Sequence, residues 1–191
     1  MNVMHNLLLY TFGRPEGIMG RVGGIVMART NRKCAAWVTD LLEIKPNDKV
    51  LEVGFGPGVG IELLAKAIPA GEISGVDFSV EMVDQAIARN KQAIEKGRVN
   101  LRHGSVECLP YEGNSFDKAL AINSLQMWSH PTTSLREMGR VLTTDGSIAL
   151  GFTPYAGQSK SGLSELLTAA GFIDVKVVES VLGFCALAVK P

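Results

Sequence analysis

Apolar positions recur along the chain in two patterns, which predict alternating strands and helices. Short runs rich in Val, Ile, Leu and Ala predict buried strands, and longer stretches with helical spacing of apolar residues predict amphipathic helices. The predicted strands are residues 49–54, 72–77, 99–103, 117–122, 147–152, 173–179 and 184–189. The predicted helices are residues 30–42, 60–67, 79–95, 131–141 and 162–170.

The order of these elements indicates the class of fold. Strands that alternate with helices form parallel sheets with helices on both faces, because each crossover needs a helix-length connection. The last two strands are separated by only a few residues around Gly183, which is too short for a crossover, so they must pair antiparallel. We therefore expect an α/β fold: a doubly wound, seven-stranded, mostly parallel sheet with a C-terminal antiparallel hairpin.

The first 45 residues differ from the rest of the chain. Residues 1–27 contain five glycines and predict an irregular arm that leads into the first helix. Residues 1–33 carry five basic side chains against one acidic one, which suits contact with an anionic substrate or a lipid surface. We expect residues 1–45 to form an N-terminal arm and helix, and residues 46–191 to form the main domain of one compact unit.

The composition argues against several functions. The net charge is zero at pH 7, whereas nucleic-acid-binding proteins usually carry an excess of basic residues. No apolar run reaches the length of a membrane span, and the N-terminus does not resemble a signal peptide. The three cysteines form neither a disulfide pattern nor a zinc pattern, so we expect a cytoplasmic protein without a metal site.

Residues 50–60, VLEVGFGPGVG, place alternating glycines between a strand and a helix, where glycine lets the backbone approach a ligand. The spacing fails the dinucleotide pattern G-x-G-x-x-G in every register. Glu52, an acid embedded in the strand, suits an ammonium group better than a pyrophosphate. Asp77, at the end of the second strand, is placed to accept hydrogen bonds from two ribose hydroxyls. Together these residues point to S-adenosylmethionine.

The motifs EVGFGPG and GVDFS resemble motif I and the following acidic motif of class I S-adenosylmethionine-dependent methyltransferases. The segments GSVECLPY (104–111) and NSFD (114–117), and Leu142 with Gly146 before the fifth strand, are similar to the group that includes ubiquinone and menaquinone biosynthesis methyltransferases. The resemblance implies a Rossmann-like methyltransferase fold, S-adenosylmethionine as cofactor and S-adenosylhomocysteine as product.

The resemblance also implies roles for individual residues. Positions expected at the cofactor are Glu52, Gly54, Gly56, Gly58, Asp77, Phe78, Met82, Ser105 and Val106. The glycines would lie against the amino-acid moiety with Glu52 beneath them, Asp77 would hold the ribose, and Phe78 would flank the adenine. Ser105 stands where the group often has an aspartate, so cofactor affinity is expected to depend more on Asp77.

The segment after the fourth strand lies at the carboxyl end of the sheet, where acceptors bind in such folds. Asn123 is expected to line the cofactor, Trp128 to form an apolar wall, and His130 is a candidate base. In similar methyltransferases the segment before the first strand often covers the site, so residues 1–45 are a candidate lid with Tyr10 against the substrate. Methyl transfer requires alignment of the acceptor more than a fixed base.

The sequence therefore predicts an S-adenosylmethionine-dependent methyltransferase that acts on a small molecule, lipid-like or quinone-like. Other functions stay open: a non-catalytic cofactor-binding module or partner subunit, an RNA methyltransferase, and a nicotinamide-dependent oxidoreductase. The neutral charge disfavours RNA, and the glycine spacing disfavours nicotinamide. The acceptor, the methylated atom and the oligomeric state depend on surfaces assembled from distant loops, which the pattern leaves open.

Overall fold

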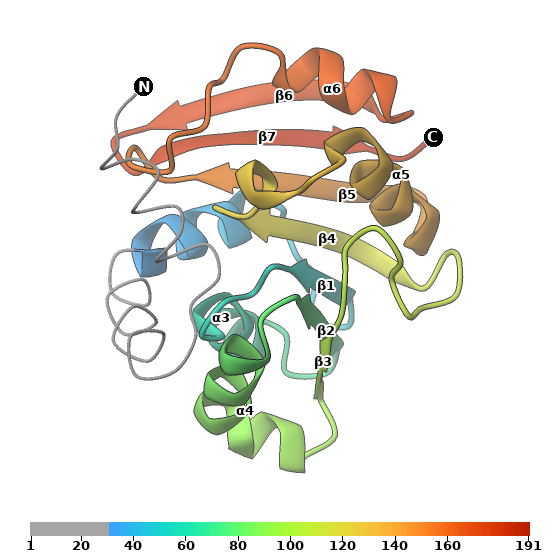
Figure 1. The fold of residues 1–191 in the computed structure, drawn as a ribbon. Helices are drawn as coiled ribbons and strands as arrows, with labels where there is room; N and C mark the ends of the chain where they lie inside the picture. The colour runs from blue at the N-terminus through green and yellow to red at the C-terminus, as the bar shows by residue number, and fades with distance from the viewer. Residues whose placement is uncertain (1–30) are drawn as a thin grey trace.

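The computed structural model describes residues 31–191, built around a sheet of seven strands in the order β3-β2-β1-β4-β5-β7-β6 (Figure 1). The strands are β1 (Lys49–Val53), β2 (Glu72–Asp77), β3 (Val99–His103), β4 (Phe116–Ile122), β5 (Leu142–Phe152), β6 (Ile173–Ser180) and β7 (Gly183–Val189). The helices are residues 31–41, α3 (Val59–Ala67), α4 (Val80–Glu95), the short 3-10 helix η1 (Leu125–Met127), α5 (Pro131–Val141) and α6 (Leu163–Ala169). No helix among these residues is long and apolar enough to cross a membrane.

The strand directions match the predicted doubly wound sheet. Strands β1 to β5 run parallel, and β7 lies antiparallel between β5 and β6, so the predicted terminal hairpin is confirmed. In the centre, β1 pairs with β2 on one side and with β4 on the other. The strand order reverses at this point, so the loops that leave β1 and β4 diverge and open a crevice at the carboxyl ends of these strands.

Successive residues of the central strands face two separate cores, because side chains alternate across a strand. Leu51 and Ala119 pack in the core that includes buried residues of α5 and α6. Val50 and Leu120 pack in the core that includes buried residues of α3 and α4. Figure 1 shows α5 and α6 beside the half of the sheet formed by β5, β7 and β6, and α3 and α4 beside the other half.

The helix at residues 31–41 is part of this second core. Cys34, Val38 and Leu42 are each 2% exposed or less and pack with residues of α3 and β1. The main core therefore continues across the predicted boundary at residue 45. Residues 1–30, with Tyr10 and most of the basic arm, lie outside the described residues, so the lid and the lipid contact stay predictions.

Local sequence signals explain where two helices begin. Ser79 precedes α4, and its hydroxyl accepts a hydrogen bond from the backbone N–H of Met82 at 3.4 Å, so Ser79 caps the start of this helix. Pro131 opens α5, where the missing backbone N–H would have no partner within the helix. These two helix starts fix the positions of the loops that follow β2 and β4.

The fifth strand begins earlier than predicted. β5 starts at Leu142, which pairs with Phe116, and residues 144–146, which precede the predicted strand at 147–152, lie inside the observed strand. The register shifts between Phe116 and Lys118, and Asp145 has a φ of 61°. A bulge of this kind accommodates turn-forming residues without ending the strand, which explains the difference.

Candidate cofactor site

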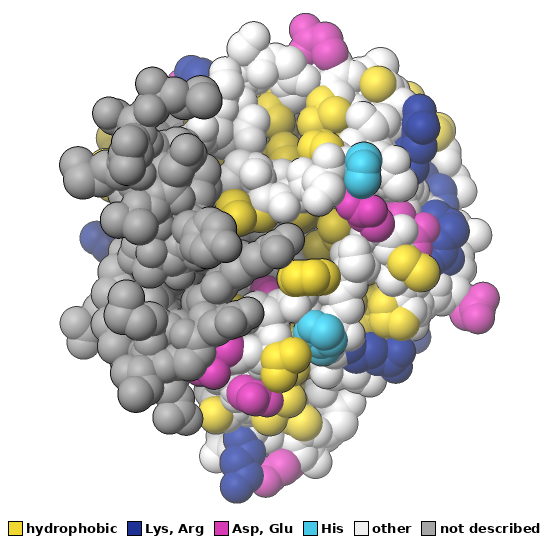
Figure 2. All heavy atoms as spheres, in the orientation of Figure 1, with side chains coloured by type: hydrophobic (Ala, Val, Ile, Leu, Met, Phe, Trp, Pro, Cys, Tyr) yellow, Lys and Arg dark blue, Asp and Glu magenta, His cyan; other side chains and the backbone are white. Residues whose placement is uncertain are grey.

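A cavity of about 350 Å³ opens at the carboxyl ends of the central strands. It is lined by the glycine loop after β1 and by the segments that follow β2, β3 and β4. The lining residues are Val53, Gly54, Gly56, Val76, Asp77, Phe78, Ser79, Met82, Gly104, Ser105, Val106, Glu107, Asn123, Ser124, Met127, Trp128 and Ser129. Figure 2 shows one face of the molecule, where acidic side chains (magenta) and histidines (cyan) lie near exposed apolar side chains (yellow). Most residues predicted at the cofactor thus come together in one cavity.

The carboxylate of Asp77 connects two of these segments. Its Oδ2 accepts a hydrogen bond from the backbone N–H of Gly56 at 2.7 Å, and its Oδ1 accepts one from the N–H of Ser79 at 2.9 Å. Asp77 is 9% exposed, and burial raises the pKa of this carboxyl while the backbone hydrogen bonds oppose the rise. An ionised carboxylate has about four acceptor positions, so Asp77 keeps acceptor capacity for ligand hydroxyls.

The glycine loop presents bare backbone to the cavity. The N–H of Gly54 donates to the carbonyl of Val76 at 2.8 Å, which ties the loop to β2. Gly54 has a φ of 69°, and a Cβ at this position would lie 2.5 Å from the Cβ of Ser124. Among the described residues, a Cβ at Gly56 would meet no atom within 4 Å, so this residue borders the cavity without a close neighbour. The loop needs glycine at Gly54 for its own geometry and leaves room for a ligand at Gly56.

Gly58 has a different role from the one predicted. Gly58 does not line this cavity, nor does it line a second, smaller cavity that is bordered by Glu52. A Cβ at Gly58 would lie 2.7 Å from the Cβ of Ala86, and the carbonyl of Gly58 accepts a hydrogen bond from Asn90 Nδ2 at 3.0 Å. Gly58 therefore allows α4 to pack closely against the start of α3 and does not face the cofactor cavity.

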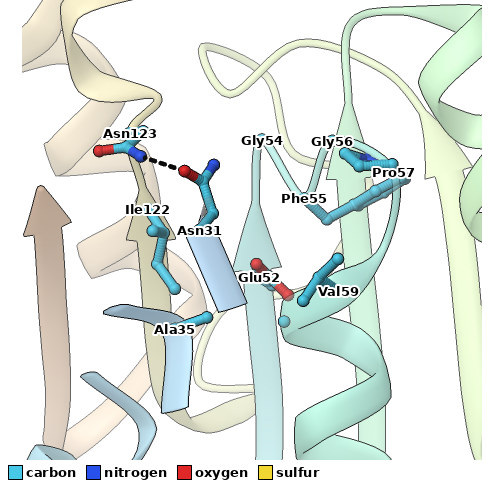
Figure 3. A pocket seen from close by; sticks show the side chains of 11 residues that line it. Asn31, Ala35, Glu52, Gly54, Phe55, Gly56, Pro57, Val59, Ile122 and Asn123 are labelled. Carbon is cyan, nitrogen blue, oxygen red and sulfur yellow. Dashed lines mark hydrogen bonds between the residues drawn. The ribbon is translucent and has the colours of Figure 1, made fainter. Parts of the chain in front are cut away.

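Glu52 lies beneath the glycine loop, as the resemblance implied, beside a second cavity of about 50 Å³ (Figure 3). This cavity is lined by Asn31, Ala35, Glu52, Gly54, Phe55, Gly56, Pro57, Val59, Gly60, Ile122 and Asn123. Glu52 is 3% exposed, and its Oε2 has no hydrogen-bond partner among the described residues. Burial, aided by the negative charge of Asp77, raises the pKa of Glu52 to about 8. A buried, unpaired carboxyl oxygen calls for a donor, which water or a ligand ammonium group supplies.

The raised pKa of Glu52 predicts that the free energy of unfolding falls as the pH rises. Between pH 4.5 and about pH 8 the folded state holds a proton that the unfolded chain has lost, so unfolding becomes easier with each step up in pH. Glu52→Gln removes this titration and keeps the shape of the side chain. Urea unfolding gives the free energy of unfolding of each protein, and the difference between wild type and variant is expected to change by up to about 1.4 kcal/mol per pH unit. Parallel profiles for the two proteins would contradict the assignment.

Asn123 joins three segments at the edge of both cavities. Its Oδ1 accepts a hydrogen bond from the backbone N–H of Thr153 at 2.9 Å, and its Nδ2 donates to Asn31 Oδ1 at 3.0 Å. The backbone N–H of Asn123 donates to the carbonyl of Gly151 at 2.9 Å, and the residue adopts a φ of 51°. Its side chain thus links the ends of β4 and β5 to the helix at residues 31–41.

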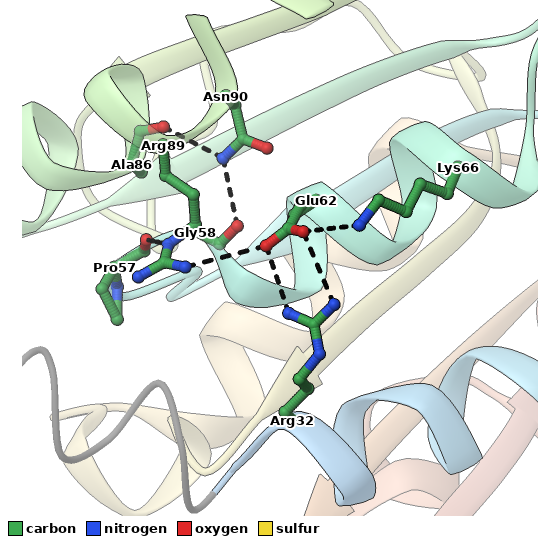
Figure 4. A network of polar contacts seen from close by, with 8 residues as sticks. All are labelled: Arg32, Pro57, Gly58, Glu62, Lys66, Ala86, Arg89 and Asn90. Atoms are coloured by element: carbon green, nitrogen blue, oxygen red, sulfur yellow. Dashed lines mark hydrogen bonds and ion pairs between the residues drawn. The ribbon is translucent and has the colours of Figure 1, made fainter.

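A charged cluster supports the glycine loop from outside (Figure 4). Glu62, in the first turn of α3, lies 2.6 Å from Lys66, 3.2 Å from Arg32 and 3.7 Å from Arg89. The Nε of Arg89 also donates to the carbonyl of Pro57 at 2.8 Å. Hydrogen bonds from Lys66 and then Arg32 lower the pKa of Glu62 to about 2. The cluster therefore connects α4, α3 and the helix at residues 31–41 around the loop.

Residues after β2 and β3 form another part of the cavity lining. Phe78 is 63% exposed and Met82 is 3% exposed, so Phe78 lines the cavity from the solvent side and Met82 from the core. His130 does not line the cavity: its side chain is 70% exposed, and its Nδ1 lies 3.1 Å from Glu107 Oε1. The structure places His130 beside a carboxylate of the lining, and its role as a base stays a prediction.

Sequence reasoning missed Asn31, Glu107, Ser124 and Met127, which all line one of the two cavities. Asn31 and Met127 stand in no motif, and their positions follow from how distant segments pack. Glu107 comes two residues after Ser105, so its place in the loop after β3 was the one signal that could have found it.

The residues present fit a nucleoside that carries a positive charge. Asp77 offers acceptors for sugar hydroxyls, the open side of Gly56 leaves room for a chain of atoms, and Glu52 holds an unpaired buried oxygen. The pyrophosphate of a dinucleotide would meet carboxylates here, because the charged side chains that the described residues contribute to the lining are Asp77 and Glu107. The site thus suits an adenosyl compound with a cationic tail better than a dinucleotide.

Comparison with known proteins decides the family. Residues 50–146 match the family described as a methyltransferase domain. The chain belongs to this methyltransferase family. The methyltransferase is 30% identical over 182 residues to the uncharacterized methyltransferase YdaC of Bacillus subtilis (strain 168), which covers 89% of this chain and 98% of the relative. It is 31% identical over 129 residues to the demethylmenaquinone methyltransferase of Staphylococcus aureus (strain Newman), which covers 67% of this chain and 52% of that protein.

The methyltransferase also shares its fold with solved structures. Haemonchus contortus phosphoethanolamine N-methyltransferase 2, solved with S-adenosylhomocysteine, matches with a TM-score of 0.77 at 15% identity and covers 100% of this chain and 61% of that one. The cofactor of this methyltransferase is S-adenosylmethionine. The predicted fold, enzyme class and cofactor are confirmed, and the family match does not favour an oxidoreductase or a non-catalytic module.

Proposed function

We propose that this methyltransferase acts on a small apolar acceptor of the quinone or lipid type. The observation that supports this proposal is the wall after β4, where Met127, 41% exposed, and Trp128 line the cavity. Apolar side chains at a cavity favour an apolar acceptor, because binding removes apolar surface from water. The likeness to a demethylmenaquinone methyltransferase supports the same class of acceptor.

We also propose how the cavity orients the cofactor. When bound, S-adenosylmethionine supplies a methyl group activated by a positively charged sulfur. In this orientation Asp77 accepts hydrogen bonds from the ribose, the glycine loop lies along the amino-acid moiety, and Phe78 flanks the adenine. Glu52 faces the ammonium group, whose charge favours the ionised form of this carboxyl and so opposes its raised pKa.

The chain's own part in the transfer is alignment of the acceptor. The hydroxyl of Ser124 donates to the carbonyl of Val53 at 3.2 Å, which holds the start of the segment after β4 against β1. The backbone N–H of Trp128 donates to the carbonyl of Leu125 at 3.1 Å, which closes the turn of η1. A wall fixed in this way restricts the approach of the acceptor and excludes water, and both effects accelerate a displacement reaction.

Turnover with acceptors of graded polarity tests this proposal. The enzyme is incubated with S-adenosylmethionine and a short-chain prenylated naphthoquinol, a fatty acid or phosphoethanolamine. We expect release of S-adenosylhomocysteine with an apolar acceptor, and mass spectrometry should show that acceptor gaining one methyl group. Turnover of phosphoethanolamine alone would contradict the proposal.

A variant of the apolar wall sharpens the same test. Met127→Ser removes an exposed apolar side chain and is expected to raise the KM for the apolar acceptor several-fold, by roughly 1 kcal/mol, with kcat little changed. Tyr155→Ser is the matched control, because Tyr155 is 87% exposed and lies outside the cavity lining. Equal KM values for Met127→Ser and wild type would argue that the acceptor does not contact this wall.

A further inference from the structure

The exposed large apolar side chains of the described residues gather at one end of the sheet. Five of the seven follow the carboxyl end of a strand: Phe78, Val80, Met127, Tyr155 and Val181. The other two lie elsewhere, Ile87 in the middle of α4 and Ile173 at the start of β6, the opposite end of the sheet. Single exposed apolar residues are normal on a protein surface, whereas a concentration of them marks a surface of interaction. We call the five residues the apolar edge.

Two members of the apolar edge lie on adjoining turns. Val181, in the turn between β6 and β7, is 96% exposed, and Tyr155, in the loop after β5, is 87% exposed. The loop turns back at Tyr155, because the N–H of Ala156 donates to the carbonyl of Thr153 at 3.1 Å. A Cβ at Gly183 would lie 3.1 Å from the Cα of Thr153, so the two turns are in contact, on the side of the sheet where β4 and β5 end (Figure 1). Two almost fully exposed apolar side chains therefore lie close to each other.

The apolar edge reaches the wall of the cofactor cavity. Phe78 and Met127 belong to both. Asn123 connects the cavity to the turns, because it lines the cavity and its Oδ1 accepts the hydrogen bond from the N–H of Thr153. Neighbouring strands lie about 5 Å apart, so β7 is only about 10 Å from β4 across the sheet. An apolar acceptor bound at Met127 is therefore close to the exposed turns.

We propose that the apolar edge docks on a lipid membrane, so that the acceptor passes from the bilayer into the cavity. This inference rests on the proposed apolar acceptor, which would dissolve in the bilayer. A stable protein–protein interface buries about 800 Å² on each partner, whereas the two turns present a few separate side chains. A lipid surface adapts to such turns, and tyrosine suits the membrane interface because its ring is apolar and its hydroxyl stays in contact with water. The shape and composition of the edge thus favour lipid as the partner.

Sedimentation with phosphatidylcholine vesicles, with no acceptor present, tests the docking. Wild type is expected to sediment with these zwitterionic vesicles and to stay bound at high salt, because salt does not screen the burial of apolar surface. Tyr155→Ser combined with Val181→Ser should weaken vesicle binding about 10-fold or more, since each substitution removes an apolar group from the contact. Ile173→Ser is the matched control: Ile173 is 46% exposed at the other end of the sheet, so this variant should bind as wild type does.

The double variant should unfold at the same temperature as wild type, because both side chains are exposed, so that its loss of binding is not a loss of folding. The inference is overturned if wild type does not sediment with phosphatidylcholine, or if Ile173→Ser loses as much binding as the double variant. Binding only to anionic phosphatidylglycerol vesicles at low salt would also overturn it and would assign the contact to the basic residues 1–33. Because the assay contains no acceptor, a polar acceptor found by turnover would refute the proposed function and leave vesicle binding unchanged.

Discussion

Asp77→Ala is expected to weaken the binding of S-adenosylhomocysteine by roughly 100-fold or more. The carboxylate is proposed to accept from two ribose hydroxyls, and each hydrogen bond to a charged group contributes about 1.5–3 kcal/mol, with about 1.4 kcal/mol for each tenfold change in Kd. The variant also removes the acceptor for the N–H groups of Gly56 and Ser79, so the glycine loop loses one of its hydrogen bonds to β2. Isothermal titration calorimetry measures the loss directly.

Two further variants make the result at Asp77 interpretable. Asp77→Asn keeps one acceptor oxygen and should show an intermediate Kd, with a thermal unfolding midpoint closer to wild type than that of Asp77→Ala. Asp84→Ala removes an exposed carboxylate on α4 outside the lining and should bind as wild type does. If Asp77→Ala and Asp77→Asn both retained the wild-type Kd, the ribose would not be bound at this residue.

Gly60→Ala is expected to lower the free energy of unfolding by about 1–3 kcal/mol, the usual range for overpacking a core. A Cβ at Gly60 would lie 2.2 Å from Glu52 Oε1 and 2.5 Å from Oε2, and the buried Glu52 side chain has little space to move away. The substitution thus tests whether the carboxyl fills the space above the first turn of α3. Urea unfolding at one pH gives the change.

The loss of stability caused by Gly60→Ala should disappear or reverse once the Glu52 carboxyl is removed. In a Glu52→Ala background, Gly60→Ala should be neutral or stabilising by up to about 1 kcal/mol, because alanine favours a helix more than glycine does. Gly139→Ala on α5 is the control, since a Cβ there would sit 3.4 Å from the nearest atom of the Phe172 ring. An equal cost of Gly60→Ala in both backgrounds would show that Glu52 is not the obstacle.

Most of the fold could be predicted because its signals are local. The central strands β1 and β4 are short, mostly apolar runs, and the helix predicted over residues 79–95 differs from α4 by one residue at its start. Residues 144–146 misled the prediction because a Thr-Asp-Gly segment favours a turn by itself. Pairing of β5 with β4 overrode that local preference and absorbed Asp145 into a bulge.

The candidate site was predictable where one motif carries both the residue and its role, as at Gly54 and Asp77. It was not predictable where the role depends on a contact between distant residues. Gly58 stands in the same glycine run, but the approach of α4 gives it a packing role. Glu107 and His130 are 23 residues apart, and only the folded chain brings their side chains to 3.1 Å.

The cysteines of this enzyme provide a ready point of attachment for a reporter. Cys34 and Cys185 are buried, and burial raises their pKa values to about 11 and about 12, so neither thiol reacts readily near neutral pH. Cys108 is exposed and directly follows Glu107. A maleimide fluorophore should therefore label the wild-type protein at one site, beside the loop that lines the cavity, and report ligand binding without any change to the sequence.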